Sequence, residues 1–204
     1  MARKYLETHV TPAVKQAQAH YYGASAMVPP GAELDPLGPD EIDFIAARDS
    51  FYMATVSENN WPYIQHRGGP KGFLRVLGPQ QVAFLDLHGN RQMLSTGNLA
   101  ALDRVALFLM DYPHRERLKL MGHARVLDAR EHPDLVEQLR LSTQKEKAER
   151  IFIVDVVSYD WNCPKYITPR FTAEEVEEAI QPLQARIAEL EKQLAELANP
   201  KSPL

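Results

Sequence analysis

The chain has 204 residues, of which 45% are hydrophobic and 25% charged, and its net charge is −4. This length and composition fit one soluble-type domain with appendages, and the weakly acidic balance argues against a general nucleic-acid-binding surface. No apolar run is long enough to cross a bilayer and the N-terminus lacks a secretory pattern, so we expect no membrane partner and a cytoplasmic location.

The first 39 residues are predicted to form a helix followed by an extended loop. Thr11-Pro12 is a capping residue followed by a first-turn proline, and Gly23 is placed to end the helix. Residues 24–38 are rich in proline and glycine, which predicts an irregular segment. Pro39 then opens a short helix whose apolar face we expect to be Ile42, Ile45 and Ala46, with Phe44 to one side.

From Phe51 onward, short apolar runs are separated by turn residues, which is typical of strands. A set of roughly seven short strands suits a small barrel, so the fold class is mostly β with flanking helices. The predicted strands cover residues 51–56, 61–66, 73–77, 81–85, 104–110, 117–127 and 151–157. One helical turn is expected at 98–103 and a helix on the outside of the barrel at 132–144.

Two small-residue loops in the barrel region each hold an arginine. The first runs from Gln65 to Gly72 and the second from Asp86 to Gln92. Glycines allow close approach of the backbone to a ligand, and arginine presents a planar, permanently charged fork that suits phosphate. Two such loops at the ends of neighbouring strands predict a site for a phosphorylated cofactor.

The C-terminal part, residues 172–204, is predicted to be an amphipathic, coiled-coil-like helix. Thr172 to Glu175 is a capping box, and apolar residues then recur in steps of four and three from Val176 to Leu197. Pro182 should kink or restart this helix. The seam either packs on the chain's own barrel or mediates self-association, and the pattern alone favours neither.

The order of these strands and loops resembles the FMN-binding split-barrel family related to pyridoxamine 5'-phosphate oxidase, and more closely its uncharacterised branch. The resemblance rests on the runs 48–56, 61–62, 66–70, 89–91, 160–164 and 167–171, and it covers roughly residues 40–171. It implies an FMN-binding split β-barrel over 40–171, an N-terminal helix and loop over 1–39, a helical extension over 172–204, and a homodimer with FMN at the interface.

The resemblance also implies which residues contact the cofactor. Gln65, His66, Arg67, Gly68 and Gly69 would line the ring and ribityl side, Asp86 and Leu87 would lie under the flavin, and Asn90, Arg91 and Gln92 would meet the phosphate. Arg117 falls where the oxidases place a flavin-contacting glutamine, and Trp161 and Arg170 resemble residues that close the oxidase site. The oxidases carry a lysine where this chain has Gln92, so FMN binding is more readily retained than vitamin B6 oxidation.

Each of these residues also has a structural interpretation. Arg91 could be a solvated turn residue, Arg67 could form a salt bridge to a neighbouring strand, His66 could lie on a strand face, and Trp161 could pack in the core. A single cysteine, Cys163, excludes an intrachain disulfide and is expected to be inert. The histidines show no metal-ligand spacing, so no metal is expected.

Two functions from different classes fit the pattern. The first is an oxidoreductase that uses bound FMN on an unidentified small substrate, in which the flavin supplies the hydride chemistry and the protein supplies orientation. The second is a non-catalytic flavin-binding carrier or redox-sensing module. The same phosphate contacts serve both, and no residue is predicted to be catalytic.

Overall fold

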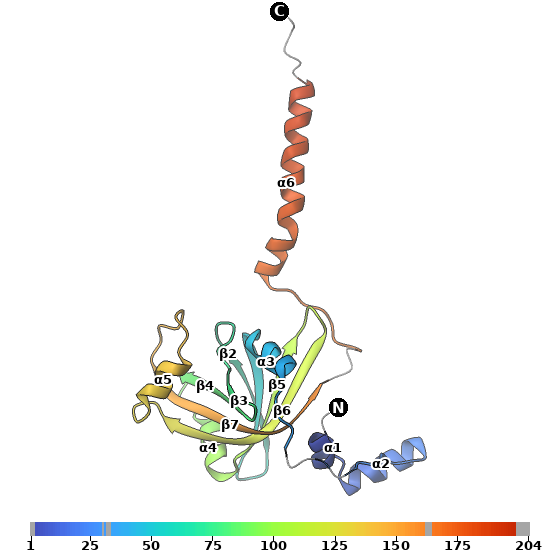
Figure 1. The fold of residues 1–204 in the computed structure, drawn as a ribbon, viewed down its shortest axis with the longest axis vertical. Coiled ribbons are helices and arrows are strands. Elements are labelled where there is room, and N and C mark those ends of the chain that lie inside the picture. The colour runs from blue at the N-terminus through green and yellow to red at the C-terminus, as the bar shows by residue number, and fades with distance from the viewer. Residues whose placement is uncertain (1–2, 30, 32–33, 162–164, 199–204) are drawn as a thin grey trace, which may run out of the picture.

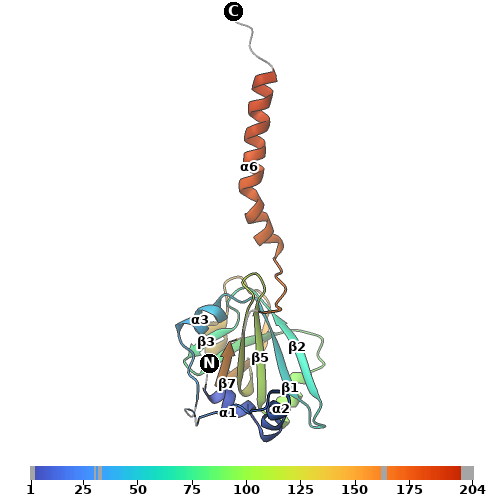
Figure 2. The ribbon, with the colours of Figure 1, turned by 90° about the vertical axis from the view of Figure 1, so that its right-hand side faces the viewer.

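A computed structural model describes residues 3–29, 31, 34–161 and 165–198 of the chain (Figures 1 and 2). Cys163 lies outside the described residues. The described part contains seven strands and six helices. The strands are β1 (Ser50–Val56), β2 (Pro62–Gly68), β3 (Arg75–Gly78), β4 (Gln81–Leu87), β5 (Arg104–Asp111), β6 (Glu116–Asp128) and β7 (Ala148–Trp161). The helices are α1 (Arg3–His9), α2 (Pro12–Tyr22), α3 (Pro39–Ala46), α4 (Leu94–Ala101), α5 (Pro133–Leu139) and α6 (Ala173–Ala198).

The strands form one antiparallel sheet in the order β2-β1-β5-β6-β7-β4-β3. The sheet curls, so that Phe51 of β1 contacts Phe84 of β4 with ring centroids 5.3 Å apart. Within the described residues no strand pairing joins the two edges, β2 and β3, and the barrel therefore remains split. The prediction of a split β-barrel with flanking helices is confirmed.

The main hydrophobic core fills the inside of the curled sheet. Strands β1 and β5 alternate buried and half-buried residues, so that Phe51, Met53, Leu107 and Leu109 point inward. Strand β4 is buried on both faces, because α5 covers its outer side: Leu139 packs with residues of β4 and β7 in a second, smaller cluster.

The N-terminal segment packs against the barrel through α1. The buried carboxylate of Asp35 accepts hydrogen bonds from the backbone N–H groups of Lys4 and Tyr5, which lie in the first turn of α1. These N–H groups have no partner inside the helix, so the carboxylate caps it. Helix α2 ends at Gly23 in the left-handed region with φ 73°, as the sequence predicts.

Four helices differ from the sequence expectation. Helix α1 was not expected, and α5 ends at Leu139 instead of at residue 144. Helix α3 buries Glu41, Phe44 and Ile45, whereas Ile42 is 36% exposed and Ala46 is also exposed, so the predicted apolar face was right only for Ile45. The reason is that Phe44 packs edge-on against Trp161, with centroids 4.8 Å apart, and turns the helix accordingly. Helix α4 spans Leu94–Ala101, four residues earlier than the single turn expected at 98–103.

The C-terminal helix α6 begins at the predicted capping box. The backbone N–H of Thr172 donates to the side chain of Glu175 at 2.8 Å, and the N–H of Glu175 donates to Oγ1 of Thr172 at 3.2 Å. The helix continues through Pro182 as one element. Among the described residues no helix is both long and apolar enough to span a bilayer.

Candidate functional site

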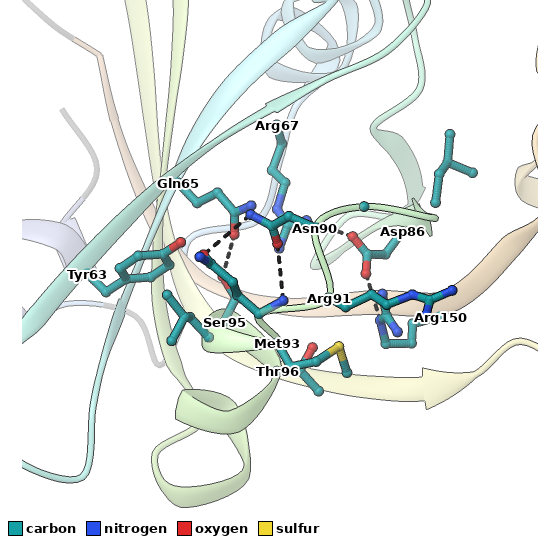
Figure 3. A pocket seen from close by; sticks show the side chains of 14 residues that line it. Tyr63, Gln65, Arg67, Asp86, Asn90, Arg91, Met93, Ser95, Thr96 and Arg150 are labelled. Carbon is teal, nitrogen blue, oxygen red and sulfur yellow. Dashed lines mark hydrogen bonds and ion pairs between the residues drawn. The ribbon is translucent and has the colours of Figure 1, made fainter.

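The two arginine loops meet at a cavity of about 180 Å³ beside the split of the barrel (Figure 3). Its walls come from β2, the end of β4, the loop that follows β4, the first turn of α4, and β7. The lining residues are Tyr63, Gln65, Arg67, Asp86, Leu87, Gly89, Asn90, Arg91, Gln92, Met93, Leu94, Ser95, Thr96 and Arg150. The cavity therefore gathers seven of the thirteen predicted site residues: Gln65, Arg67, Asp86, Leu87, Asn90, Arg91 and Gln92.

A chain of ion pairs forms one wall of this cavity. Arg67 on β2 donates to Oδ1 of Asp86 on β4 at 2.6 Å, and Nε of Arg150 on β7 donates to Oδ2 of the same carboxylate at 2.7 Å. All three side chains are less than one-fifth exposed. Because β2 and β4 are not neighbours in the sheet, the Arg67–Asp86 pair ties the two sides of the split together.

The position of this ion-pair chain follows from strand register. Asp86 lies directly opposite Arg150 in the β4–β7 ladder. Two residues further along each strand, and therefore on the same face, Phe84 lies opposite Phe152. The two rings stack with centroids 4.9 Å apart, and the guanidinium carbon of Arg67 lies 5.1 Å from the Phe152 centroid. The alternative given for Arg67 was a salt bridge to a neighbouring strand. Arg67 does form a salt bridge, but to β4, which is not a neighbour of β2 in the sheet, and Arg67 also lines the cavity.

The loop after β4 presents Arg91 in an unusual backbone conformation. Arg91 and Met93 both have positive φ, 60° and 58°, which non-glycine residues adopt uncommonly. The side-chain oxygen of Asn90 accepts from the backbone N–H of Gln92 at 3.1 Å and so fixes the turn between them. Arg91 itself is exposed, and its charge is open to the cavity.

The first turn of α4 forms the opposite wall. Its N-cap residue, Met93, makes no side-chain capping bond, so the leading backbone N–H groups of the helix are not capped from that position. Ser95 is almost fully buried and donates through Oγ to Oε1 of Gln65 at 3.0 Å, which joins the helix to β2. An uncapped helix N-terminus beside an exposed arginine is an arrangement that favours an anion.

The charges of the lining support the same conclusion. Three arginines face one carboxylate, that of Asp86, so the cavity carries a surplus of positive charge. Glu149, which precedes Arg150 on β7, hydrogen-bonds His88 at 2.8 Å. This bond, with the nearby Arg150, holds the pKa of the Glu149 carboxyl below its usual range. The Glu149 carboxylate is therefore engaged with its own neighbours at neutral pH.

Six predicted site residues do not line the cavity: His66, Gly68, Gly69, Arg117, Trp161 and Arg170. For β2 the reason is strand geometry, because successive side chains point to opposite faces. Gln65 and Arg67 are half-buried and face inward, whereas His66 and Gly68 are exposed. Gly69 has a packing role, since a Cβ at this position would lie 2.7 Å from Cγ of Phe73.

Trp161 is held in a structural contact. Its indole N–H donates to Oε1 of the buried Glu41 at 2.6 Å, and the other oxygen of Glu41 accepts from the backbone N–H of Gly38 at 2.9 Å. The pair thus fixes the N-terminus of α3 against β7. This contact matches the core-packing interpretation of Trp161 and places the indole away from the cavity.

The remaining three residues gather on the outer face of the sheet. The ring centroids of His66 and Tyr52 lie 5.5 Å apart. Arg117 lies over the ring of Phe108, and Arg170 lies over the ring of Tyr112. Burial raises the pKa of Tyr112, and its hydrogen bond to Tyr52 adds to this effect. These residues form an aromatic and basic group on the side of β2 opposite to the cavity.

Sequence reasoning missed several lining residues, of which Arg150 and Ser95 make the most specific contacts. Arg150 precedes the apolar run of β7, and only its register with Asp86 shows that it faces the site. The signal for Ser95 was the run Ser95-Thr96 directly after the second arginine loop, which can begin a helix. No group of histidine, cysteine, aspartate or glutamate suited to a metal occurs among the residues that the structure describes.

Comparison with known proteins identifies the family. The family model described as pyridoxamine 5'-phosphate oxidase matches residues 39–158, more than half of the chain. The chain belongs to this family, and the expected resemblance is confirmed. No curated protein matches it.

Solved structures with similar folds share little sequence with the chain. HupZ from Group A Streptococcus has 11% identity and a TM-score of 0.48, and 66% of this chain and 99% of that one are covered. A protein of the pyridoxinephosphate oxidase family from Clostridium acetobutylicum has 14% identity, a TM-score of 0.47 and coverages of 67% and 94%. An FMN-binding protein from Syntrophomonas wolfei has 11% identity, a TM-score of 0.45 and coverages of 59% and 81%. All three TM-scores lie below 0.5, so the family assignment rests on the family model.

Proposed function

We propose that the chain is an FMN-binding oxidoreductase that holds the flavin phosphate in the cavity between β2, the loop after β4 and α4. The observation that carries this proposal is the convergence of Arg91 with the uncapped first turn of α4 in a cavity whose arginines outnumber its carboxylates. Family membership supports the choice of a flavin.

The residues present fit the phosphate end of FMN. Arg91 offers an exposed guanidinium, and the N–H groups at the start of α4 offer backbone donors on the other side. Arg67 and Arg150 are already neutralised in part by Asp86, so their role is to hold the cavity wall rigid and positive. Gln65, bonded to Ser95, would present its amide to the ribityl chain.

A bound flavin would supply hydride chemistry, and the protein would supply position and electrostatics. The lining residues include no histidine or cysteine, so the cavity wall in this part of the chain offers no general base or nucleophile of these types. Arg91 and the ion-pair wall would bind and orient, and Leu87 and Leu94 would exclude water from part of the cleft.

The size of the cavity supports a homodimer. Ligand sites typically measure roughly 300–1,000 Å³, whereas this one measures about 180 Å³ and would hold only the phosphate end of FMN. Strand β5 is apolar on both faces, with Ala106, Phe108 and Met110 pointing outward, which is typical of a strand covered on both sides. A second copy on this outer face would bring His66, Arg117 and Arg170 to the cleft of its partner.

Reduction of the bound flavin tests the oxidoreductase part of the proposal. The purified yellow protein is mixed anaerobically with NADH or NADPH, and flavin absorbance is followed before and after air is admitted. An oxidoreductase is reduced and reoxidised over many turnovers, faster than free FMN at the same concentration. Reduction no faster than that of free FMN, by either donor, would favour the non-catalytic carrier or sensor.

A further inference from the structure

Helix α6 presents an apolar seam that no described part of the chain covers. Its 26 residues include no buried side chain, and the helix projects away from the barrel (Figures 1 and 2). Seven seam residues are between 37% and 76% exposed: Val176, Ile180, Leu183, Ile187, Leu190, Leu194 and Leu197. Packing on the chain's own barrel, one of the two alternatives left open by the sequence, is not what the structure has.

A helix in this state lacks the usual source of helical stability. Most helical stability in proteins comes from burial of an apolar face, and isolated helices are marginal in water. Pro182 removes a further backbone hydrogen bond from the helix interior, at a cost of about 3 kcal/mol. The exposed seam is therefore the surface through which α6 gains its stability.

The spacing of the seam identifies the kind of partner. Its residues alternate in steps of four and three throughout, which is the 3.5-residue period of a coiled coil and differs from the 3.6-residue period of a helix lying on a globular surface. In heptad terms Ile180, Ile187 and Leu194 occupy position a, and Val176, Leu183, Leu190 and Leu197 occupy position d. β-Branched residues at a with leucine at d favour parallel dimers.

The flanking charges favour the same orientation. Arg186 occupies position g and Glu191 position e of the following heptad, the two positions that face each other across a parallel, in-register pair. An antiparallel pair would place Arg186 beside the partner's Arg186 and Glu177 beside the partner's Glu191. In the single chain Arg186 bonds Glu189 at 2.6 Å, and both side chains are more than half exposed, so this bond is readily exchanged.

We propose that α6 pairs with α6 of a second copy of this chain as a parallel, in-register, two-stranded coiled coil. Pro182 falls at position c, on the outside of such a pair, where its ring meets no partner residue. The pairing is separate from flavin binding, since no residue of α6 lines the cavity. It adds a second contact between chains, beyond any contact between the barrels.

Cysteine cross-linking in the full chain tests the orientation. In a Cys163→Ser background, Leu194→Cys places a thiol at position a and Lys192→Cys places one at position f, on the outside. A parallel pair oxidises Leu194→Cys to covalent dimers at a yield severalfold above that of Lys192→Cys, because only the former lies within disulfide reach of its copy. Equal yields, or no cross-linking, would overturn the proposal. Preferential cross-linking between a Leu194→Cys chain and a Val176→Cys chain would also overturn it. An antiparallel pair predicts that result, because it brings position 194 of one chain beside position 176 of the other and leaves the two copies of position 194 about 27 Å apart along the axis.

Hydrogen exchange gives an independent readout with a matched pair of variants. Leu190→Asp places a charge in the seam, and Ala188→Asp places the same charge at the outer position b. Amides of residues 183–197 should be protected in the wild type and in Ala188→Asp and exchange rapidly in Leu190→Asp. Rapid exchange in the wild type would contradict the pairing. FMN content should be equal in all three proteins, and failure of the whole set to bind FMN would count against the proposed function and leave this inference intact.

Discussion

The three arginines of the cavity differ in what surrounds their charge. Arg67 and Arg150 share the carboxylate of Asp86, whereas Arg91 is exposed and stands at a left-handed turn. A free charge can be neutralised by a ligand, while a paired one must first give up its partner. Arg91 is therefore the side chain whose removal should affect a phosphate most directly.

Replacing Arg91 with alanine should weaken FMN binding. The loss of a charge-assisted hydrogen bond costs about 1.5–3 kcal/mol, which corresponds to a roughly ten- to hundred-fold higher dissociation constant. Titration of apoprotein with FMN, followed by quenching of flavin fluorescence, measures this change.

Arg115→Ala is the matched control, since Arg115 has nearly the same φ of 59° and lies outside the cavity. Arg75→Ala, on the exposed edge strand, serves as a second control. A small and equal effect of all three substitutions would refute the role of Arg91.

Asp111 gives the fold a defined dependence on acid pH. Burial opposes ionisation of this carboxyl, but hydrogen bonds from the backbone of His114 and from Arg48, 2.6 Å away, lower its pKa below 3.8 overall. A lowered folded-state pKa means that the stabilisation is fully present above the unfolded-state value and is lost as pH falls through the folded-state value.

Asp111→Asn should therefore destabilise the protein at pH 7 by about 3 kcal/mol, because it leaves Arg48 without its buried carboxylate. The difference from wild type should shrink as pH falls below 3.8, because the carboxyl is then protonated first in the unfolded state and, at still lower pH, in the folded state. Urea unfolding at pH 7 and at pH 3 measures both values. Asp43→Asn, at an exposed position on α3, should change neither. A destabilisation that is equal at both pH values would show that the ionised carboxylate is not the cause.

At the scale of single residues, Arg91 lies in the cavity lining, as do Gln65 and Arg67 of the five consecutive positions 65–69 that were expected to contact the cofactor. The two-residue period of a strand lets only alternate side chains face this cavity of the single chain. The order of the sheet decides which set faces inward. Arg150 could not be found from local sequence, because its position depends on a pairing with β4 more than sixty residues away.

Among the elements, the strands were the most predictable. All seven predicted strands are present with small shifts at their ends, because alternating apolar residues and turn signals act over short distances. The helices depended more on tertiary contacts. Helix α3 presents Phe44 to Trp161, and α4 starts at Leu94 because the turn at Arg91 to Met93 directs the chain into it.

Strand β6 depends on a glycine at its irregularity. The register between β6 and β7 shifts between Met121 and Gly122, and a Cβ on Gly122 would collide with the carbonyl oxygen of Asp155 and lie 2.9 Å from Cγ1 of Val154. Gly122→Ala should therefore lower the free energy of unfolding by about 1–3 kcal/mol, the usual cost of overpacking. Thermal unfolding measures the effect, with Gly78→Ala as control because nothing lies within 4 Å of its added Cβ. Unchanged stability in Gly122→Ala would show that the ladder adjusts freely here.

For the whole molecule, the N-terminal segment and α6 differ in how they contact the barrel. Nζ of Lys119 on β6 donates to the hydroxyl of Tyr5, and the backbone N–H of Asp35 donates to the carbonyl of Val157 on β7, which ties the N-terminal segment to the barrel. By contrast, none of the described residues of α6 is buried. The acidic tail and the neutral barrel also differ in charge. Whether α6 lies on its own barrel could not be derived from the sequence, because the placement of the helix is a tertiary feature that only the structure shows.

Deletion of residues 172–204 should leave a dimer that still binds FMN, because the proposed cleft is formed by the barrel and α6 lines no part of it. Loss of the helix should reduce the strength of association without abolishing it. Sedimentation of the truncated protein, monitored at a flavin wavelength, measures mass and cofactor together. A monomer that has lost its flavin would show that the helix, and not the barrel, makes the dimer.

Identification of the released cofactor tests the central proposal most directly. The protein is purified without added flavin and denatured by heat, and the supernatant is separated by chromatography against FMN and FAD standards. Because Arg91 and the first turn of α4 present donors suited to a terminal phosphate, we predict non-covalent FMN, close to one molecule per chain after reconstitution. A colourless protein that takes up no added FMN would contradict the account.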